Sequence, residues 1–80
     1  MTKKEKRHNR IARSPANVSF DEAVAWLLSF GFKEVRTKGG HHIFTHPLWD
    51  GILTMQSKKG YAKPYQIRQA LKAIKEISDE

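Results

Sequence analysis

The sequence contains no cysteine, so a disulfide framework and a thiolate metal site are both excluded. A chain without cysteine suits a reducing compartment, and we expect a cytoplasmic protein. No apolar run approaches the roughly 18 residues that a membrane-spanning helix needs. The basic N-terminus is not followed by an apolar segment either, so we expect neither membrane insertion nor secretion.

Acidic residues are scarce: eight Asp and Glu face fifteen Lys and Arg, which gives a net charge of +7. Residues 1–13 hold six basic side chains against Glu5 and so carry +5. Residues 33–63 hold six more against Glu34 and Asp50, which adds +4. This excess favours an anionic partner, most commonly nucleic acid, although a basic surface that serves only solubility stays an alternative.

Several familiar kinds of active site are poorly supported by the residues present. Two isolated acids in the central segment argue against a paired-carboxylate hydrolase, and no serine stands in a nucleophile elbow. The pair Gly39-Gly40 is not followed by Gly-Lys-Ser/Thr, so it is not a Walker loop. Only His42 and His46 share a strand face, which is too few ligands for zinc, and we expect no metal and no cofactor.

Eighty residues that are 39% hydrophobic predict one small domain. Residues 1–13 are almost free of apolar groups and predict a mobile basic arm or at best a short frayed helix. Residues 14–17 contain Pro15 and predict a linker. We therefore divide the chain into an arm and linker, residues 1–17, and a domain, residues 18–80.

Within residues 18–80 the pattern predicts an α-β-β-β-α domain of the α+β class. Ser19 and Glu22 have the form of a capping box, and Gly31 is placed to end a helix over residues 20–30. Its expected apolar positions are Phe20, Ala23, Val24, Leu27, Leu28 and Phe30.

Short extended runs follow at residues 32–37, 42–46 and 52–56, with a turn at 47–51, and Pro64 begins a second helix. Short connections favour a three-stranded antiparallel sheet with both helices on one face. The other face and the Gly39-Gly40 edge would then be open to a ligand.

The most informative segment is Lys38-Gly39-Gly40-His41-His42-Ile43-Phe44-Thr45-His46-Pro47. Histidine takes and gives protons near neutral pH, and a glycine pair beside a lysine allows a phosphate to come close. His41 directly follows the glycines, whereas His42 would point to the opposite face of an extended strand. The run therefore suggests proton transfer on a polyanion.

One imidazole and several cations suffice for a metal-free reaction, the cleavage of RNA through its own 2′-hydroxyl. From the residues alone, RNA binding ranks above RNA cleavage, because one histidine together with basic side chains is weak evidence for catalysis. A module that captures an acidic protein partner is a third possibility.

The chain resembles the HicA family of toxins, the RNA-cleaving halves of HicAB toxin–antitoxin pairs. The resemblance covers roughly residues 18–77. The matching words are Leu28-Ser29-Phe30-Gly31-Phe32, Arg36-Thr37-Lys38-Gly39-Gly40-His41-His42-Ile43-Phe44 with His46-Pro47, and Lys63-Pro64-Tyr65-Gln66-Ile67-Arg68-Gln69-Ala70-Leu71.

This resemblance implies a double-stranded-RNA-binding-like fold and ribosome-independent cleavage of mRNA, with His41 as the catalytic residue. It also implies neutralisation by a HicB-like antitoxin that covers the active site; we expect a monomer when free and a hetero-oligomer with the antitoxin. For phosphate or RNA contact we select Lys38, Gly39, Gly40, His42, Lys58, Lys59 and Lys63.

Two features depart from the family pattern. The segment 1–17 is longer than in the shortest members, which leaves open an extra RNA contact or a tail without a role. Trp49 stands in the turn after Pro47, where polar residues are usual. It would stack on a base or anchor a partner if exposed, or fold back over the core.

Overall fold

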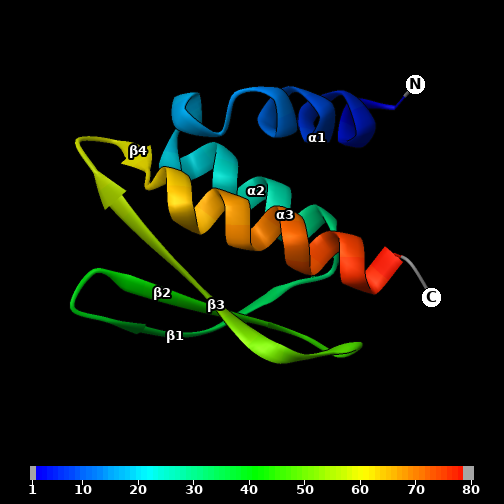
Figure 1. The fold of residues 1–80 in the computed structure, drawn as a ribbon. Helices are drawn as coiled ribbons and strands as arrows, with labels where there is room; N and C mark the ends of the chain where they lie inside the picture. Colours follow the sequence, from blue (N-terminus) through cyan, green and yellow to red (C-terminus); the bar gives the residue numbers. More distant parts are fainter. Residues whose placement is uncertain (1, 79–80) are drawn as a thin grey trace.

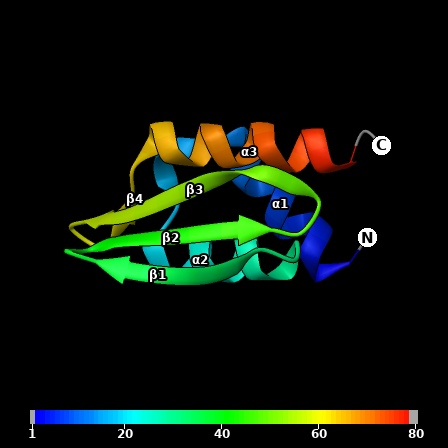
Figure 2. The same ribbon diagram turned by 90° about the horizontal axis from the view of Figure 1, so that it is seen from below.

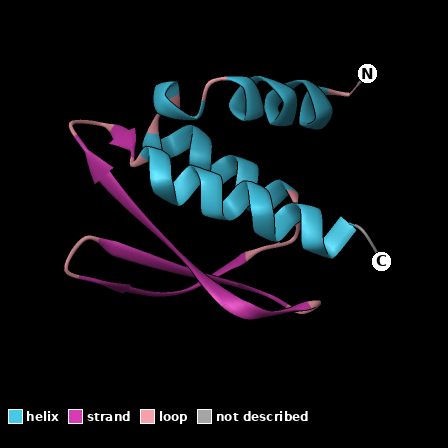
Figure 3. Ribbon diagram, in the orientation of Figure 1, coloured by secondary structure: helices cyan, strands magenta, loops and turns pink. Residues whose placement is uncertain are grey.

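The computed structural model describes residues 2–78, and within them helices pack on one side of an antiparallel sheet (Figures 1 and 3). The elements are α1 (Lys3–Arg13), η1 (Pro15–Asn17), α2 (Phe20–Ser29), β1 (Lys33–Lys38), β2 (His41–His46), β3 (Trp49–Lys58), β4 (Tyr61–Ala62) and α3 (Pro64–Ser78). The α+β class is confirmed, and the order from α2 to α3 fits the predicted α-β-β-β-α arrangement with one additional strand, β4.

The sheet has four strands in the order β1-β2-β3-β4, not the three expected. The additional strand arises because Lys59 and Gly60 both have positive φ, 54° and 86°, as a two-residue hairpin turn requires. This turn folds Tyr61 and Ala62 back onto β3. The expected turn at 47–51 is also too long, because Trp49 already pairs with His46.

All three α-helices lie on the same side of the sheet (Figures 1 and 2), so the expected one-sided arrangement is confirmed. The core between the layers is formed by the buried apolar side chains of Ile11, Val18, Ala23, Trp26, Leu27, Phe32, Phe44, Leu53, Met55, Ala62, Ile67, Ala70, Ala73 and Ile74. Among the elements of residues 2–78, none covers the other face of the sheet, which we call the open face.

Helix α2 begins and ends at the predicted signals. The Ser19 hydroxyl accepts a hydrogen bond from the Glu22 amide at 3.1 Å. Gly31, at φ +91°, lets the amide of Phe32 return to the carbonyl of Leu27 at 3.1 Å, which closes the helix. The Glu22 carboxylate, however, does not complete the predicted capping box; it accepts a hydrogen bond from Nη1 of Arg10 at 2.9 Å.

Of the two alternatives for the N-terminal segment, the mobile arm is wrong, and the short helix forms but is capped and packed rather than frayed. Residues 3–13 form α1, which starts with a capping box between Thr2 and Glu5 and buries Ile11 completely. The indole N–H of Trp26 donates to Nδ1 of His8 at 3.1 Å, so α1 is bonded to α2. An isolated helix of this length is marginal in water, and these tertiary contacts explain why it forms.

Candidate nucleic-acid interface

The hairpin between β1 and β2 is built on a two-residue glycine turn. Gly39 and Gly40 have φ of 56° and 82°, the two positive values that a type I′ turn requires. A Cβ at either glycine would meet no atom within 4 Å. The glycines are therefore needed for backbone conformation, and they leave the turn uncovered beside Lys38 and His41, which pair across it.

His41 lies on the open face of the sheet. Successive side chains of a strand alternate between faces, and Phe44 of β2 is buried against the helices. His42 shares that inner face, with its ring centroid 4.8 Å from that of Phe20. His41 is exposed on the opposite face, and Lys38 stands beside it because directly paired residues share a face. The predicted separation of His41 from His42 is thus confirmed.

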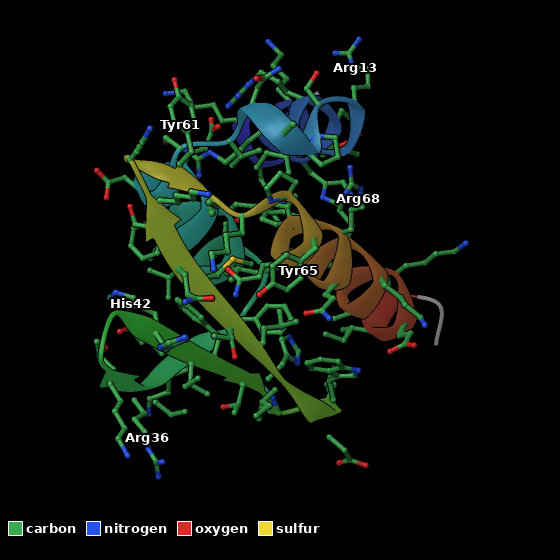
Figure 4. All side chains as sticks on the ribbon, turned by 60° about the vertical axis from the view of Figure 1, so that its left-hand side comes forward. Arg13, Arg36, His42, Tyr61, Tyr65 and Arg68 are labelled. Atoms are coloured by element: carbon green, nitrogen blue, oxygen red, sulfur yellow. The ribbon has the colours of Figure 1, made fainter. Side chains whose placement is uncertain are left out.

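A β-bulge in β1 decides which charges join His41. Glu34 pairs with Phe44 and Arg36 pairs with Ile43, so Val35 is an extra residue between them. Arg36 shares the open face with Lys38 and His41 because it stands two residues before Lys38, whereas the extra residue moves Glu34 off this face. Figure 4 shows Arg36 pointing away from the helices.

The same bulge places Glu34 on the inner face with Thr37 and His42. Nδ1 of His42 lies 2.9 Å from Oε2 of Glu34, and the Thr37 hydroxyl donates to the same carboxylate oxygen. The hydrogen bond from Thr37 and then the hydrogen bond with His42 lower the pKa of Glu34, against an opposing effect of desolvation, and the charge of His42 lowers it further. We name these three residues the inner-face cluster.

Lys58 and Lys59 lie at the second hairpin turn, between β3 and β4. Figures 1 and 2 place this turn at the same end of the molecule as the Gly39-Gly40 turn. The carbonyl of Gly60 in this turn accepts a hydrogen bond from the amide of Phe20 at 2.9 Å, which ties the turn to α2. Lys63 follows β4 directly and is half-buried. The predicted cations are therefore gathered at one end of the domain.

His46 is fully engaged in holding the fold together. Its Nε2 lies 3.0 Å from the carbonyl of Phe30, and its Nδ1 accepts from the amide of Leu48 at 3.0 Å. The imidazole thereby joins the end of α2 to the turn between β2 and β3. Within residues 2–78, no group of three or more His, Asp or Glu side chains is placed to hold a metal ion.

Trp49 folds back onto the protein, which confirms one of the two alternatives for this residue. Its indole N–H donates to Oε2 of Glu76 at 2.9 Å, and its ring meets that of Phe32 edge-on at 6.2 Å. Gly51 is required beneath it, because a Cβ there would lie 2.5 Å from the indole.

Sequence reasoning missed Arg36 and both partners of His42. Arg36 was detectable, since it stands two residues before Lys38 and alternate strand residues share a face. Glu34 and Thr37 are three residues apart and would fall on opposite faces of a regular strand. Only the bulge brings Glu34 and Thr37 together, and no residue in this segment predicts a bulge.

Two further observations concern the chain as a whole. No helix within residues 2–78 is long and apolar enough to cross a membrane. In comparisons with known proteins, no curated protein and no solved structure matches the chain. A family model does match: the one described as the HicA toxin of bacterial toxin–antitoxin systems aligns with residues 20–75, from the start of α2 almost to the end of α3. The chain therefore belongs to the HicA toxin family.

Proposed function

We propose that this HicA-family toxin is a metal-independent, ribosome-independent endoribonuclease that cleaves mRNA in the cytoplasm, with His41 as general acid or base. One observation carries the proposal: His41 pairs with Lys38 on the open face, beside a glycine turn that no side chain covers. A proton-transfer group, a cation and free backbone amides are thus available to one phosphate.

The chemistry asks little of the protein, because RNA supplies its own nucleophile. A base removes the proton of the 2′-hydroxyl, the oxygen attacks the adjacent phosphorus, and an acid protonates the departing 5′-oxygen. Within residues 2–78, the His41 ring has no hydrogen-bond or ring partner, so both nitrogens are free for this exchange. Lys38 and Arg36 would stabilise the negative charge that develops on the phosphate.

A HicB-like antitoxin would neutralise the toxin by covering the open face. This face carries exposed apolar side chains beside its cations: Val35 and Ile52 line a shallow hollow with Arg36, Ile43 and Thr45. Apolar groups rimmed by charge are typical of protein-binding surfaces. We expect a monomer in the free toxin and a hetero-oligomer with the antitoxin.

Induced expression of the wild type and of His41→Ala in matched cells tests the catalytic role. The wild type should arrest growth and fragment total RNA, and His41→Ala should do neither while staying folded by circular dichroism. Purified wild type should cleave RNA in EDTA without ribosomes. Continued toxicity of a folded His41→Ala protein would refute the role of His41.

A non-catalytic RNA-binding module is the second candidate, and one observation favours it. Among the described residues, His41 is the one imidazole on the open face, so a second proton-transfer group is not evident there. This candidate predicts salt-dependent binding that releases counterions at several phosphates, with intact RNA after long incubation with the wild type.

A further inference from the structure

The two tyrosines differ from every other aromatic side chain of the protein. Trp26, Phe32 and Phe44 are buried, and the remaining phenylalanines and Trp49 are partly buried against the core. Tyr61 and Tyr65, in contrast, are 55% and 52% exposed. They lie four residues apart, at β4 and in the first turn of α3 (Figure 4).

Each tyrosine has a cation beside it. Tyr61 pairs across the β3–β4 hairpin with Lys58, so the two side chains share a face of the ribbon. Tyr65 and Arg68 are three residues apart on α3 and are neighbours on the helix surface. Both cations are exposed. An aromatic ring with an adjacent cation suits the binding of one nucleotide, because the ring can stack on the flat base and the cation can pair with the phosphate.

The faces of both rings are unoccupied by aromatic or cationic groups of the protein. Within residues 2–78, none of the ring–ring contacts involves a tyrosine, and the one cation–π contact is that of Lys4 with Phe30. The hydroxyl of Tyr65 accepts a long contact of 3.4 Å from Nε2 of Gln66, which is itself buried. The Tyr65 side chain is therefore held at its hydroxyl, while about half of the residue is exposed to solvent (52%).

We propose that Tyr61 and Tyr65 form a stacking site for unpaired bases of RNA, with Lys58 and Arg68 at the neighbouring phosphates. The site lies outside the His41 hairpin and rests on the proposed action on RNA. Stacking on a side chain needs a base whose face is free, and bases inside an A-form duplex do not offer one. The site therefore selects single-stranded segments.

Binding measured in the His41→Ala background tests this without cleavage of the probe. The probes are a fluorescein-labelled mixed-sequence 12-nucleotide RNA and the same strand annealed to its complement, followed by anisotropy. Tyr61→Ala and Tyr65→Ala should each weaken single-strand binding by roughly 5- to 150-fold, the range expected for loss of one stacked base. Duplex binding should change by less than about twofold, since charge remains intact.

Matched substitutions separate stacking from other roles. Tyr61→Phe and Tyr65→Phe keep the aromatic ring and should bind RNA like the parent protein. Leu48→Ala is the control for the loss of an exposed side chain, because Leu48 is exposed to a similar degree and lies in the turn at the other end of the sheet. Phe variants as weak as the Ala variants, or equal losses for duplex RNA, would overturn the proposal. So would unchanged RNA affinity with lost antitoxin affinity, which would make the tyrosines a protein contact. If the parent protein binds no RNA, the proposed function itself fails. If the parent binds RNA but the wild type does not cleave it, the stacking site is supported and the proposed cleavage is not.

Discussion

The carboxylate of Glu34 lies 2.9 Å from Nδ1 of His42, and this contact joins β1 to β2 on the face turned away from His41. Thr37 and His42 pair directly beside Lys38 and His41 along the hairpin. The inner-face cluster therefore holds the two strands together one residue before the candidate site. Its strength depends on pH because the carboxyl of Glu34, whose pKa is lowered by these contacts, must be ionised to make them fully.

We expect the cluster to stabilise the protein most above the ordinary carboxyl pKa. The pKa of Glu34 is lowered in the folded state, so its contribution is complete above the unfolded-state value and disappears as the pH falls through the folded-state value. Thermal unfolding of wild type and Glu34→Gln should differ near neutrality and converge in acid. Asp50→Asn, which removes one negative charge elsewhere, should show no such convergence; a pH-independent difference for Glu34→Gln would contradict the prediction.

Substitution of His46 and of His41 should have different effects on stability, because His46 has a structural role and the role proposed for His41 is functional. His46→Ala removes the partners of the Phe30 carbonyl and the Leu48 amide, and we expect a loss of roughly 1–3 kcal/mol in the free energy of unfolding. His41→Ala removes an exposed, unpartnered ring and should change stability by less than about 0.5 kcal/mol. Urea titration measures both. Equal losses for the two variants would mean that His41 has a structural role.

Helix α1 should prove to be an integral part of the folded domain. Ile11 is 0% exposed, and Ile11→Ala should lower the free energy of unfolding by roughly 2–5 kcal/mol, as for other large-to-small core substitutions. Ile52→Ala, at a position that is 64% exposed, is the matched control and should cost less than about 1 kcal/mol. A negligible effect of Ile11→Ala in chemical denaturation would show that α1 is dispensable.

Local signals in the sequence predicted the elements that depend on local chemistry. Ser19 and Gly31 mark the ends of α2 because a cap and a left-handed residue act within one turn. The glycine pair specified the first hairpin for the same reason. The face of α2 was less certain: Leu28, expected inside, is 53% exposed, whereas Trp26 is fully buried.

Tertiary partners explain most of what the sequence could not predict. Trp26 can be buried because His8, eighteen residues away, accepts its indole N–H. Gln66, also unexpected in the core, is buried because its side chain bonds both the amide and the side chain of Gln56. At the site, the neighbours of His41 followed from strand alternation, but the environment of His42 depends on the bulge at Val35.

The bulge at Val35 also bears on self-association. Strand β1 is one edge of the sheet and is exposed along its length, the kind of strand that invites pairing with another chain. An extra residue interrupts its ladder, and Lys33, Arg36 and Lys38 add mutual repulsion between copies. The opposite edge, β4, is only two residues long. The bulge and the cations of β1 therefore oppose the pairing of this edge with a second copy of the chain.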